Sequence, residues 1–324
     1  MIAMPRIRVL AVTCAVLLGG AVSVRAAETE AGPVADVSSG TAHQALFAVA
    51  FDGANGVAVG ANGDIRESGD GGKTWKAVES PEHAALFGVA FNAKRAIAVG
   101  QKGAIVVRDE KGAWSAVNQT VSKERLLAVS MNGATAIAVG SFGALLRSTD
   151  GGANWESVAP KWQDYSSDGA DPNLYAVHVG ADGTVTAAGE FGIVARSTDG
   201  GATWESRHKG EATLFGLKFG ANGVGYAVGQ DGAVIRTADG GATWNDVDTG
   251  VKTNLLAVAL AADGSIYATG MHELFAGRDD GKPWERLTAS ADGGGLWYTG
   301  LAAAPGANDV VAVGQTAHIL KLGN

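Results

Sequence analysis

The sequence predicts an all-β protein folded as a seven-bladed β-propeller, with the ring closed by an N-terminal strand. Three observations lead to this prediction. A turn motif recurs about every 40 residues, short apolar strands lie between its copies, and glycines occupy fixed places in every unit. A repeat of this kind is typical of a four-stranded propeller blade. The motif reads SGDGGKTW in its first copy, and its copies end at Trp75, Trp114, Trp155, Trp204, Trp244 and Trp284.

Each unit has the same order of predicted strands. It opens with an apolar strand such as residues 46–51, and a second strand follows that ends in Ala-Val-Gly or a close variant. A two-residue tip, a third strand, the Asp-containing turn and a fourth strand complete the unit. Seven such glycines predict seven blades: Gly60, Gly100, Gly140, Gly189, Gly229, Gly270 and Gly314.

The seventh unit lacks its fourth strand, because the chain ends soon after residues 318–322. Residues 34–37, Val-Ala-Asp-Val, resemble the fourth strand of another unit, residues 244–247. We therefore expect residues 34–37 to pair beside 318–322 and to close the ring, which removes an exposed sheet edge. The propeller is expected to span residues 34–324.

The Asp-containing turn has residues that a tight hairpin needs. Its glycine pair can adopt positive φ, its aspartate can accept hydrogen bonds from nearby backbone N–H groups, and its tryptophan can cover the hairpin. Copies spaced evenly around a ring lie far apart, so we expect neither a shared metal site nor paired catalytic carboxylates. The predicted structural residues are Asp70, Trp75, Asp150, Trp155, Asp199, Trp204, Asp239, Trp244, Asp279 and Trp284.

The N-terminal residues 1–26 read as a secretory signal peptide. Arg6 and Arg8 precede an apolar run over residues 9–24, and cleavage is expected after Ala26. Residues 27–33 would then form a short tail. The protein is expected to be exported, to the periplasm or to a lumenal or extracellular space, without inserting into the membrane itself.

Composition limits the partners. Removal of residues 1–26 would take away three arginines and the only cysteine, leaving 22 basic and 33 acidic side chains. Such an acidic protein is not expected to bind nucleic acid through a general basic surface. The mature chain would also contain no disulfide.

These motifs resemble those of the photosystem II stability/assembly factor family, whose members combine Asp-box (BNR) turns with LFxVxF and AVGxxGxIxRS elements. The matching segments here include residues 46–51, 148–155 and 197–204. The resemblance implies a seven-bladed, non-enzymatic scaffold that binds a protein partner and assists assembly or stability of a membrane or envelope complex; photosynthetic members hold a subunit precursor. It implies a membrane-associated partner, and we expect a monomer with no cofactor.

The Asp box also occurs in sialidases, so a propeller that binds or cleaves glycans is the alternative function. A sialidase would need an arginine triad, a nucleophilic tyrosine with a glutamate, and an aspartic acid. The sequence shows no such set, and its histidines lack the spacing of a metal site. We therefore expect no enzyme activity.

Arginines occupy one repeat position in several blades, which invites comparison with an arginine cluster used by photosynthetic members of the family. Arg147 and Arg196 each have a glutamate nine residues further on, Glu156 and Glu205. This spacing predicts cross-strand ion pairs within a hairpin, and we do not expect a ligand site there. Arg236 lies at the same position in the fifth blade.

One long insertion, residues 159–172, separates the third and fourth blades and contains Trp162 and Tyr165. Phe142 and Phe191, the only aromatic residues at the Gly-x-x-Gly tips, belong to these two blades. The four aromatic side chains are therefore predicted to gather around the insertion. They form either an exposed partner-binding cluster or a set of contacts that holds the insertion in place.

Overall fold

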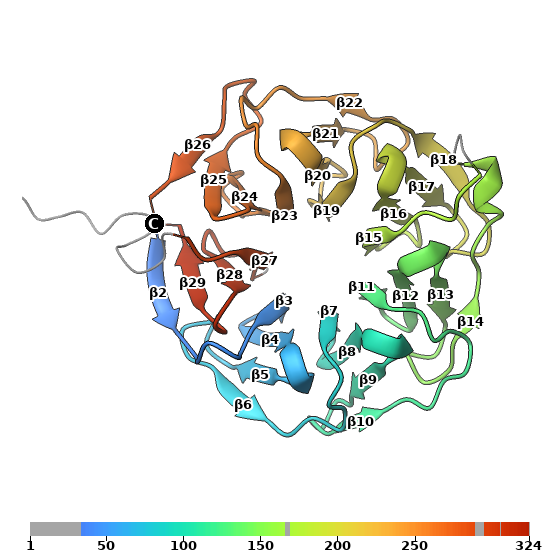
Figure 1. Ribbon diagram of the computed structural model, residues 1–324, viewed down its shortest axis with the longest axis vertical. Helices are drawn as coiled ribbons and strands as arrows, with labels where there is room; N and C mark the ends of the chain where they lie inside the picture. Colours follow the sequence, from blue (N-terminus) through green and yellow to red (C-terminus); the bar gives the residue numbers. More distant parts are fainter. Residues whose placement is uncertain (1–33, 166–168, 289–294, 305, 324) are drawn as a thin grey trace, which may run out of the picture. The chain divides into compact units, whose positions relative to one another are not determined.

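The described residues form seven four-stranded antiparallel sheets arranged as the blades of a ring (Figure 1). The computed structural model describes residues 34–165, 169–288, 295–304 and 306–323, all within one compact unit over residues 33–324. The expected signal peptide and tail, residues 1–33, lie outside them. The predicted seven-bladed propeller is confirmed.

The first four blades follow the chain in order. Blade one contains β3 (Leu46–Asp52), β4 (Asn55–Gly60), β5 (Ile65–Ser68) and β6 (Lys76–Val78). Blade two contains β7 (Leu86–Asn92), β8 (Arg95–Gly100), β9 (Ile105–Arg108) and β10 (Trp114–Ala116). Blade three contains β11 (Leu126–Asn132), β12 (Thr135–Gly140), β13 (Leu145–Ser148) and β14 (Glu156–Ser157). Blade four contains β15 (Leu174–Val179), β16 (Val185–Gly189), β17 (Val194–Ser197) and β18 (Glu205–His208).

Three further blades complete the ring. Blade five contains β19 (Leu214–Phe219), β20 (Gly225–Gly229), β21 (Val234–Thr237) and β22 (Asn245–Asp246). Blade six contains β23 (Leu255–Leu260), β24 (Ile266–Gly270), β25 (Glu273–Gly277) and β26 (Glu285–Leu287). Blade seven contains β27 (Tyr298–Ala303), β28 (Val310–Gly314), β29 (Ile319–Leu322) and β2 (Val34–Ser38).

The two ends of the propeller meet in blade seven. Strand β2 pairs antiparallel with β29, with Val34 opposite Leu322 and Asp36 opposite Leu320. The blade therefore takes its first three strands from the end of the chain and its outermost strand from the beginning (Figure 1). Val34 is buried with Leu322 and Tyr298 in the core beside this blade, so the pairing is reinforced by apolar burial.

The hydrophobic core lies between neighbouring blades. The innermost strands contact one another in sequence, from β3 through β7, β11, β15, β19 and β23 to β27, which returns to β3. One core cluster joins Ile137 and Leu145 of blade three to Leu174 and Ile193 of blade four, all of them inaccessible to solvent. Burying one such side chain contributes roughly 1.5–3 kcal/mol, so each blade depends on its neighbours.

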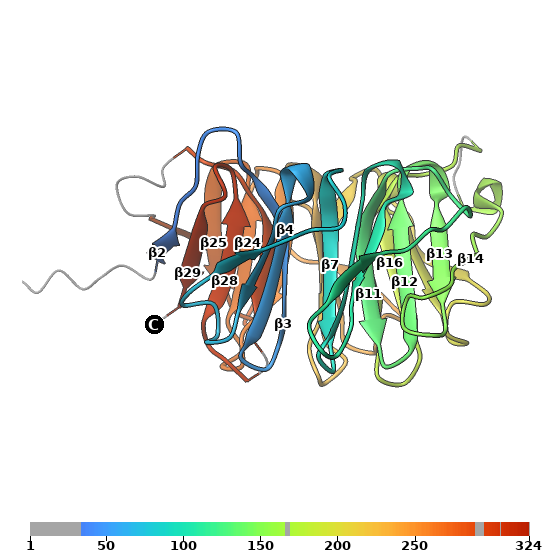
Figure 2. The same ribbon diagram turned by 90° about the horizontal axis from the view of Figure 1, so that it is seen from below.

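The antiparallel order gives the ring two different faces, seen edge-on in Figure 2. The tip face carries the Gly-x-x-Gly tips η1 (Ala61–Gly63), η2 (Gln101–Gly103), η3 (Ser141–Gly143), η5 (Glu190–Gly192) and η6 (Gln230–Gly232), together with the starts of the innermost strands. The Asp-box face carries the hairpin turns between the third and fourth strands. The insertion, which contains η4 (Trp162–Asp164), reaches the tip face, because Gly143 donates to the carbonyl of Pro172 over 2.7 Å.

In six of the seven blades, the glycine that ends the second strand is required by close packing; Gly270 is the exception. Gly60 has extended backbone with φ −163°, which any residue adopts. A Cβ atom at this position would lie 1.9 Å from the carbonyl oxygen of Ala45, so no larger residue fits. Ala61 donates to that same carbonyl over 2.9 Å. The repeated Ala-Val-Gly motif thus fixes the tip against the start of the innermost strand.

Candidate functional site: the tip face and the central channel

Four of the five predicted Asp-box carboxylates bond within their own turns. In the first copy, Asp70 accepts hydrogen bonds from the backbone of Lys73 and Thr74, both at 2.9 Å, and from the Thr74 hydroxyl at 2.6 Å. The Ser68 hydroxyl donates to Asp70 and accepts from the backbone of Gly72, whose φ is +84°. Bonds from the Thr74 side chain and backbone lower the pKa of Asp70 to about 2.

Equivalent hydrogen bonds form at three further copies, so these aspartates stay ionised and accept hydrogen bonds from the backbone of their turns. Hydrogen bonds from the residue four positions further on are the main cause of the lowered pKa in each case. The tryptophan indole N–H then donates to a glycine carbonyl of the turn. The residues with this arrangement are Asp150 with Trp155, Asp199 with Trp204, and Asp239 with Trp244.

The sixth hairpin departs from the expected pattern. Asp279 does not hold its own turn; it receives the Arg236 guanidinium of blade five, with Nε donating to Oδ1 over 2.8 Å. Its neighbour Asp280 accepts the backbone N–H of Lys282 instead. The structural role predicted for Asp279 is therefore wrong in its detail, because the aspartate joins two blades. Trp284 is buried as expected.

The arginine position forms ion pairs, but most of them join blades. Arg147 pairs with Glu156 across its hairpin at 2.7 Å, as predicted. Arg196 lies opposite Glu205 in the strand register, yet its Nε donates to the carbonyl of Gly240 in the next blade. In blade two, Arg108 pairs at 2.8 Å with Glu67 of blade one. The contacts of Arg196 and Arg108 join neighbouring blades, so these charged side chains help to stabilise the ring.

Two of the four predicted aromatic site residues are buried. Trp162 is only 3% exposed and donates from Nε1 to the carbonyl of Gly143 over 2.9 Å. Tyr165 is 9% exposed and donates from its hydroxyl to the carbonyl of Trp204 over 2.6 Å. Their rings meet edge to face at 5.4 Å. Of the two alternatives, the exposed cluster is wrong for Trp162 and Tyr165, because these side chains hold the insertion against blades three and four.

The two tip phenylalanines differ from each other. Phe191 is partly buried and packs against the core between blades three and four. Phe142 is 70% exposed. Its φ is +53°, in a left-handed region that suits Asn or Asp and disfavours a bulky residue. The equivalent residue of the first tip is Asn62, with φ +56°. Neither backbone conformation nor burial explains an aromatic side chain at position 142.

A β-bulge lies near the start of all seven innermost strands. In blade one the register shifts between Leu46 and Ala48, which leaves Phe47 as the extra residue. A bulge redirects the side chain at that position, and here the redirected side chains line the mouth of the central channel on the tip face. The bulged residues are Phe47, Phe87, Leu127, Tyr175, Phe215, Leu256 and Thr299.

The mouth residues form aromatic contacts with one another and remain half-buried. Phe47 lies 5.4 Å from Phe87 and 6.0 Å from Trp297, ring centre to ring centre. On the opposite side, Tyr175 meets Phe215 edge to face at 5.2 Å. Sequence reasoning missed this mouth. The available signal was the pair of large apolar residues, such as Leu46-Phe47, at the start of each unit, which strict strand alternation does not explain.

Hydrogen bonds connect the mouth to the Phe142 tip. Asn173 accepts from the backbone N–H of Phe142 at 3.0 Å and donates to Glu190 at 2.9 Å. Glu190 accepts from the Tyr175 hydroxyl at 3.4 Å. Phe142 and Tyr175 are therefore linked through Asn173 and Glu190. We use the name aromatic surface for the aromatic residues at the mouth and this tip: Phe142, Tyr175, Phe215, Phe47, Phe87 and Trp297.

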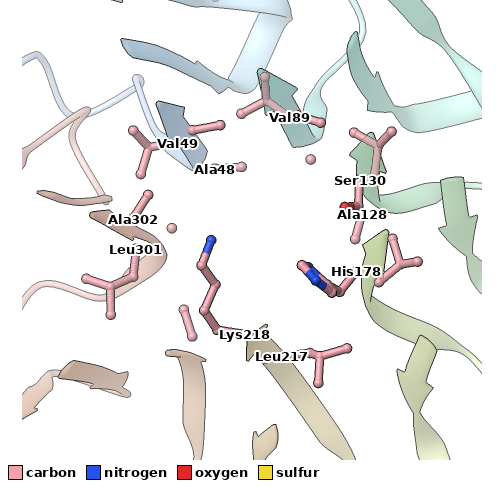
Figure 3. A pocket seen from close by; sticks show the side chains of 18 of the residues that line it. Ala48, Val49, Val89, Ala128, Ser130, His178, Leu217, Lys218, Leu301 and Ala302 are labelled. Atoms are coloured by element: carbon pink, nitrogen blue, oxygen red, sulfur yellow. The ribbon is translucent and has the colours of Figure 1, made fainter. Parts of the chain in front are cut away.

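Below the mouth, the central channel has a volume of about 590 Å³ and is lined by the innermost strands of all seven blades. Its walls are mostly Ala, Val and Leu side chains, with Lys218 and His178 pointing into the opening (Figure 3). In the described part of the chain, no group of three or more His, Cys, Asp or Glu side chains is placed to hold a metal ion. Nor does any described helix have the length and apolar character to cross a membrane.

Fold and hairpins together define the class: a seven-bladed β-propeller built from repeats with aspartate-centred turns. Residues 33–157 match the family described as Photosynthesis system II assembly factor YCF48. This match to a photosystem II assembly factor family confirms the resemblance found in the sequence.

Solved structures show the same fold. YCF48 from Cyanidioschyzon merolae has a TM-score of 0.71 at 19% identity, covering 90% of this chain and 98% of that one. A structure described as YCF48 bound to D1 peptide has a TM-score of 0.68 at 18% identity, covering 90% and 96%. The WD40 β-propeller domain of Doa1 reaches 0.68 at 10% identity, covering 90% and 97%. No curated protein matches the chain significantly.

Proposed function

We propose that this protein is a non-catalytic propeller that binds a protein partner through the aromatic surface and thereby assists assembly or stability of a membrane or envelope complex. The observation that carries the proposal is Phe142, which is exposed and held in a backbone conformation unfavourable for phenylalanine. Strained residues of this kind cluster at functional sites. The similarity to a structure described as YCF48 bound to D1 peptide supports a peptide or protein as the ligand.

The chemistry of the aromatic surface suits a protein partner. Phenylalanine, tyrosine and tryptophan bury large areas with few rotatable bonds, and they are enriched among the residues that contribute most to protein interfaces. The strands beneath Phe47, Phe87 and Tyr175 are fixed by bulged pairing, so the surface is preorganised. Export by the N-terminal signal would place this partner in the periplasm or an equivalent compartment.

Site-specific crosslinking in the native host tests the proposal. A photoreactive amino acid is placed at Phe142 and at Phe87 on the tip face, and at exposed Lys73 on the Asp-box face as the control. Both tip-face positions should crosslink to the same protein, which mass spectrometry then identifies, and position 73 should not. Crosslinks only from position 73, or binding to a glycan array with no protein crosslink, would contradict the proposal.

A further inference from the structure

The lining of the central channel breaks the repeat symmetry at one position. The fifth residue of the innermost strand is small in five blades, as Ala50 is in blade one. In blade five the same position is Lys218, and in blade four it is His178. The remaining equivalents are Ala90, Ser130, Ala259 and Ala302. Figure 3 shows the Lys218 amine directed into the open channel.

Lys218 is the only charged side chain among the described lining residues, and no aspartate or glutamate is among them. No hydrogen bond or ion pair joins its amine to another described residue. The nearby His178 stacks on Phe219 at 4.8 Å, and burial, together with the Lys218 charge, lowers the pKa of His178 to about 4. When protonated, Lys218 is therefore a single cation facing a mostly apolar channel.

An unpaired cation in such surroundings is unfavourable and attracts an anion. Alanine occupies the equivalent position in four other blades, so the fold does not require a lysine there. The channel volume of about 590 Å³ falls within the range of small-molecule sites, roughly 300–1,000 Å³. Its walls, which include Val49, Val89 and Leu301 (Figure 3), suit an aliphatic stem.

We propose that the central channel binds an aliphatic carboxylate, with the carboxylate on the Lys218 amine and the apolar stem directed toward the aromatic mouth. Lys218 is three residues along β19 from Phe215 at the mouth, which corresponds to about 10 Å of strand. The ligand chemistry is shared by a free fatty acid and by the C-terminus of a peptide with an apolar last residue. This inference does not depend on the proposed partner at the aromatic surface.

Calorimetric titration with octanoate tests the site, with octanol as the uncharged probe of similar stem. Lys218→Met keeps most of the side-chain volume and removes the charge; Lys252→Met, at an exposed lysine outside the channel, is the matched control. Octanoate should bind native protein and Lys252→Met at least tenfold more tightly than octanol. The preference should disappear in Lys218→Met, and in Lys218→Gln as a second variant should the first fold poorly.

The pH dependence gives an independent readout. Burial lowers the pKa of Lys218, so octanoate affinity should fall as pH rises through a value below the ordinary lysine range. The other titratable groups nearby are His178 on β15, whose pKa of about 4 leaves it uncharged at neutral pH, and Tyr226 opposite Lys218 on β20, whose pKa burial raises to about 12. Asp182, close to His178, is ionised throughout this range; β23 contributes no charged residue.

The source of the carboxylate is resolved by a second pair of probes, the peptide Val-Val-Ala-Leu with a free or an amidated C-terminus. Tighter binding of the free form that requires Lys218 assigns the site to a chain terminus, whereas octanoate binding alone assigns it to a fatty acid; both results support the proposal. Equal affinity for octanoate and octanol, an unchanged preference in Lys218→Met, or no binding of either carboxylate would overturn it.

Discussion

The two faces of the propeller use repeated residues in different ways. On the Asp-box face, the polar side chains of the four complete hairpins bond within their own turns, and their tryptophans cover those turns. On the tip face, the residues that break the repeat differ: Trp162 and Tyr165 are buried and hold the insertion, whereas Phe142 is exposed. The comparison indicates that recurring residues build the ring, while exposed residues peculiar to one blade are the better candidates for function.

Removal of residues 27–40 should have the largest effect, because it deletes β2, the strand through which the ring is joined. Val34 is buried beside this blade and Val37 is partly buried, and each buried side chain of this size contributes roughly 1.5–3 kcal/mol. Thermal unfolding should show the whole propeller melting earlier in one transition. A deletion of residues 27–33 is the matched control. Equal melting temperatures for both deletions would show that pairing of β2 with β29 does not stabilise the propeller.

Trp162→Ala should come next, with a loss of about 3–5 kcal/mol in the free energy of unfolding, the usual cost of truncating a buried tryptophan. The change removes the contact with Gly143 and opens space beside Tyr165. Phe142→Ala, a nearby aromatic truncation at an exposed site, should cost less than about 0.5 kcal/mol. Urea denaturation compares the two. Similar losses in the free energy of unfolding for both variants would show that Trp162 contributes no more to stability than the exposed Phe142.

A smaller effect is expected from the Asp-box carboxylates at low pH. Their folded-state pKa lies near 2 for Asp70, Asp150 and Asp239, against about 3.9 in an unfolded chain. Because the folded value is depressed, the stabilisation is complete above pH 4 and is lost as pH falls from about 4 toward 2.

Asp150→Asn should therefore flatten the decline of melting temperature over this range, since one titrating group is removed. Asp246→Asn, at an exposed strand residue outside the turns, should leave the slope unchanged. An identical acid slope in native protein and Asp150→Asn would show that these aspartates do not stabilise the turns through their charge.

The repeats allowed the fold to be predicted from the sequence, because glycines such as Gly60 and turn residues such as Asp70 recur at the same positions of successive units. Local patterns also predicted the Arg147–Glu156 pair, because cross-strand neighbours follow from hairpin register. The partners of Arg236 and Glu67 lie in neighbouring blades. The residue pattern within one hairpin does not predict such contacts between blades.

The candidate site was harder to predict for the same reason. The sequence left open whether Trp162 and Tyr165 are exposed or hold the insertion in place. The answer depends on a contact between Trp162 and Gly143 at the tip of blade three, 19 residues away along the chain. The channel mouth depends on bulges that direct Phe47 and its equivalents inward, and bulges are not visible in apolar alternation. In the sequence, Lys218 looks like an ordinary strand residue. Only the closed ring shows that it faces a channel lined by the innermost strands of all seven blades.

Phe142→Asn tests the central claim most directly, with affinity measured for the partner identified by crosslinking. Asparagine tolerates the left-handed backbone, so stability should rise by roughly 1 kcal/mol. Loss of the aromatic ring should weaken binding by about 2 kcal/mol, roughly 30-fold. Lys102→Asn, at the equivalent tip of blade two with φ +58°, should raise stability similarly and leave affinity unchanged. Unchanged affinity in Phe142→Asn, with loss of binding in Arg147→Glu, would contradict the account. It would show that the partner binds at Arg147 and not at Phe142.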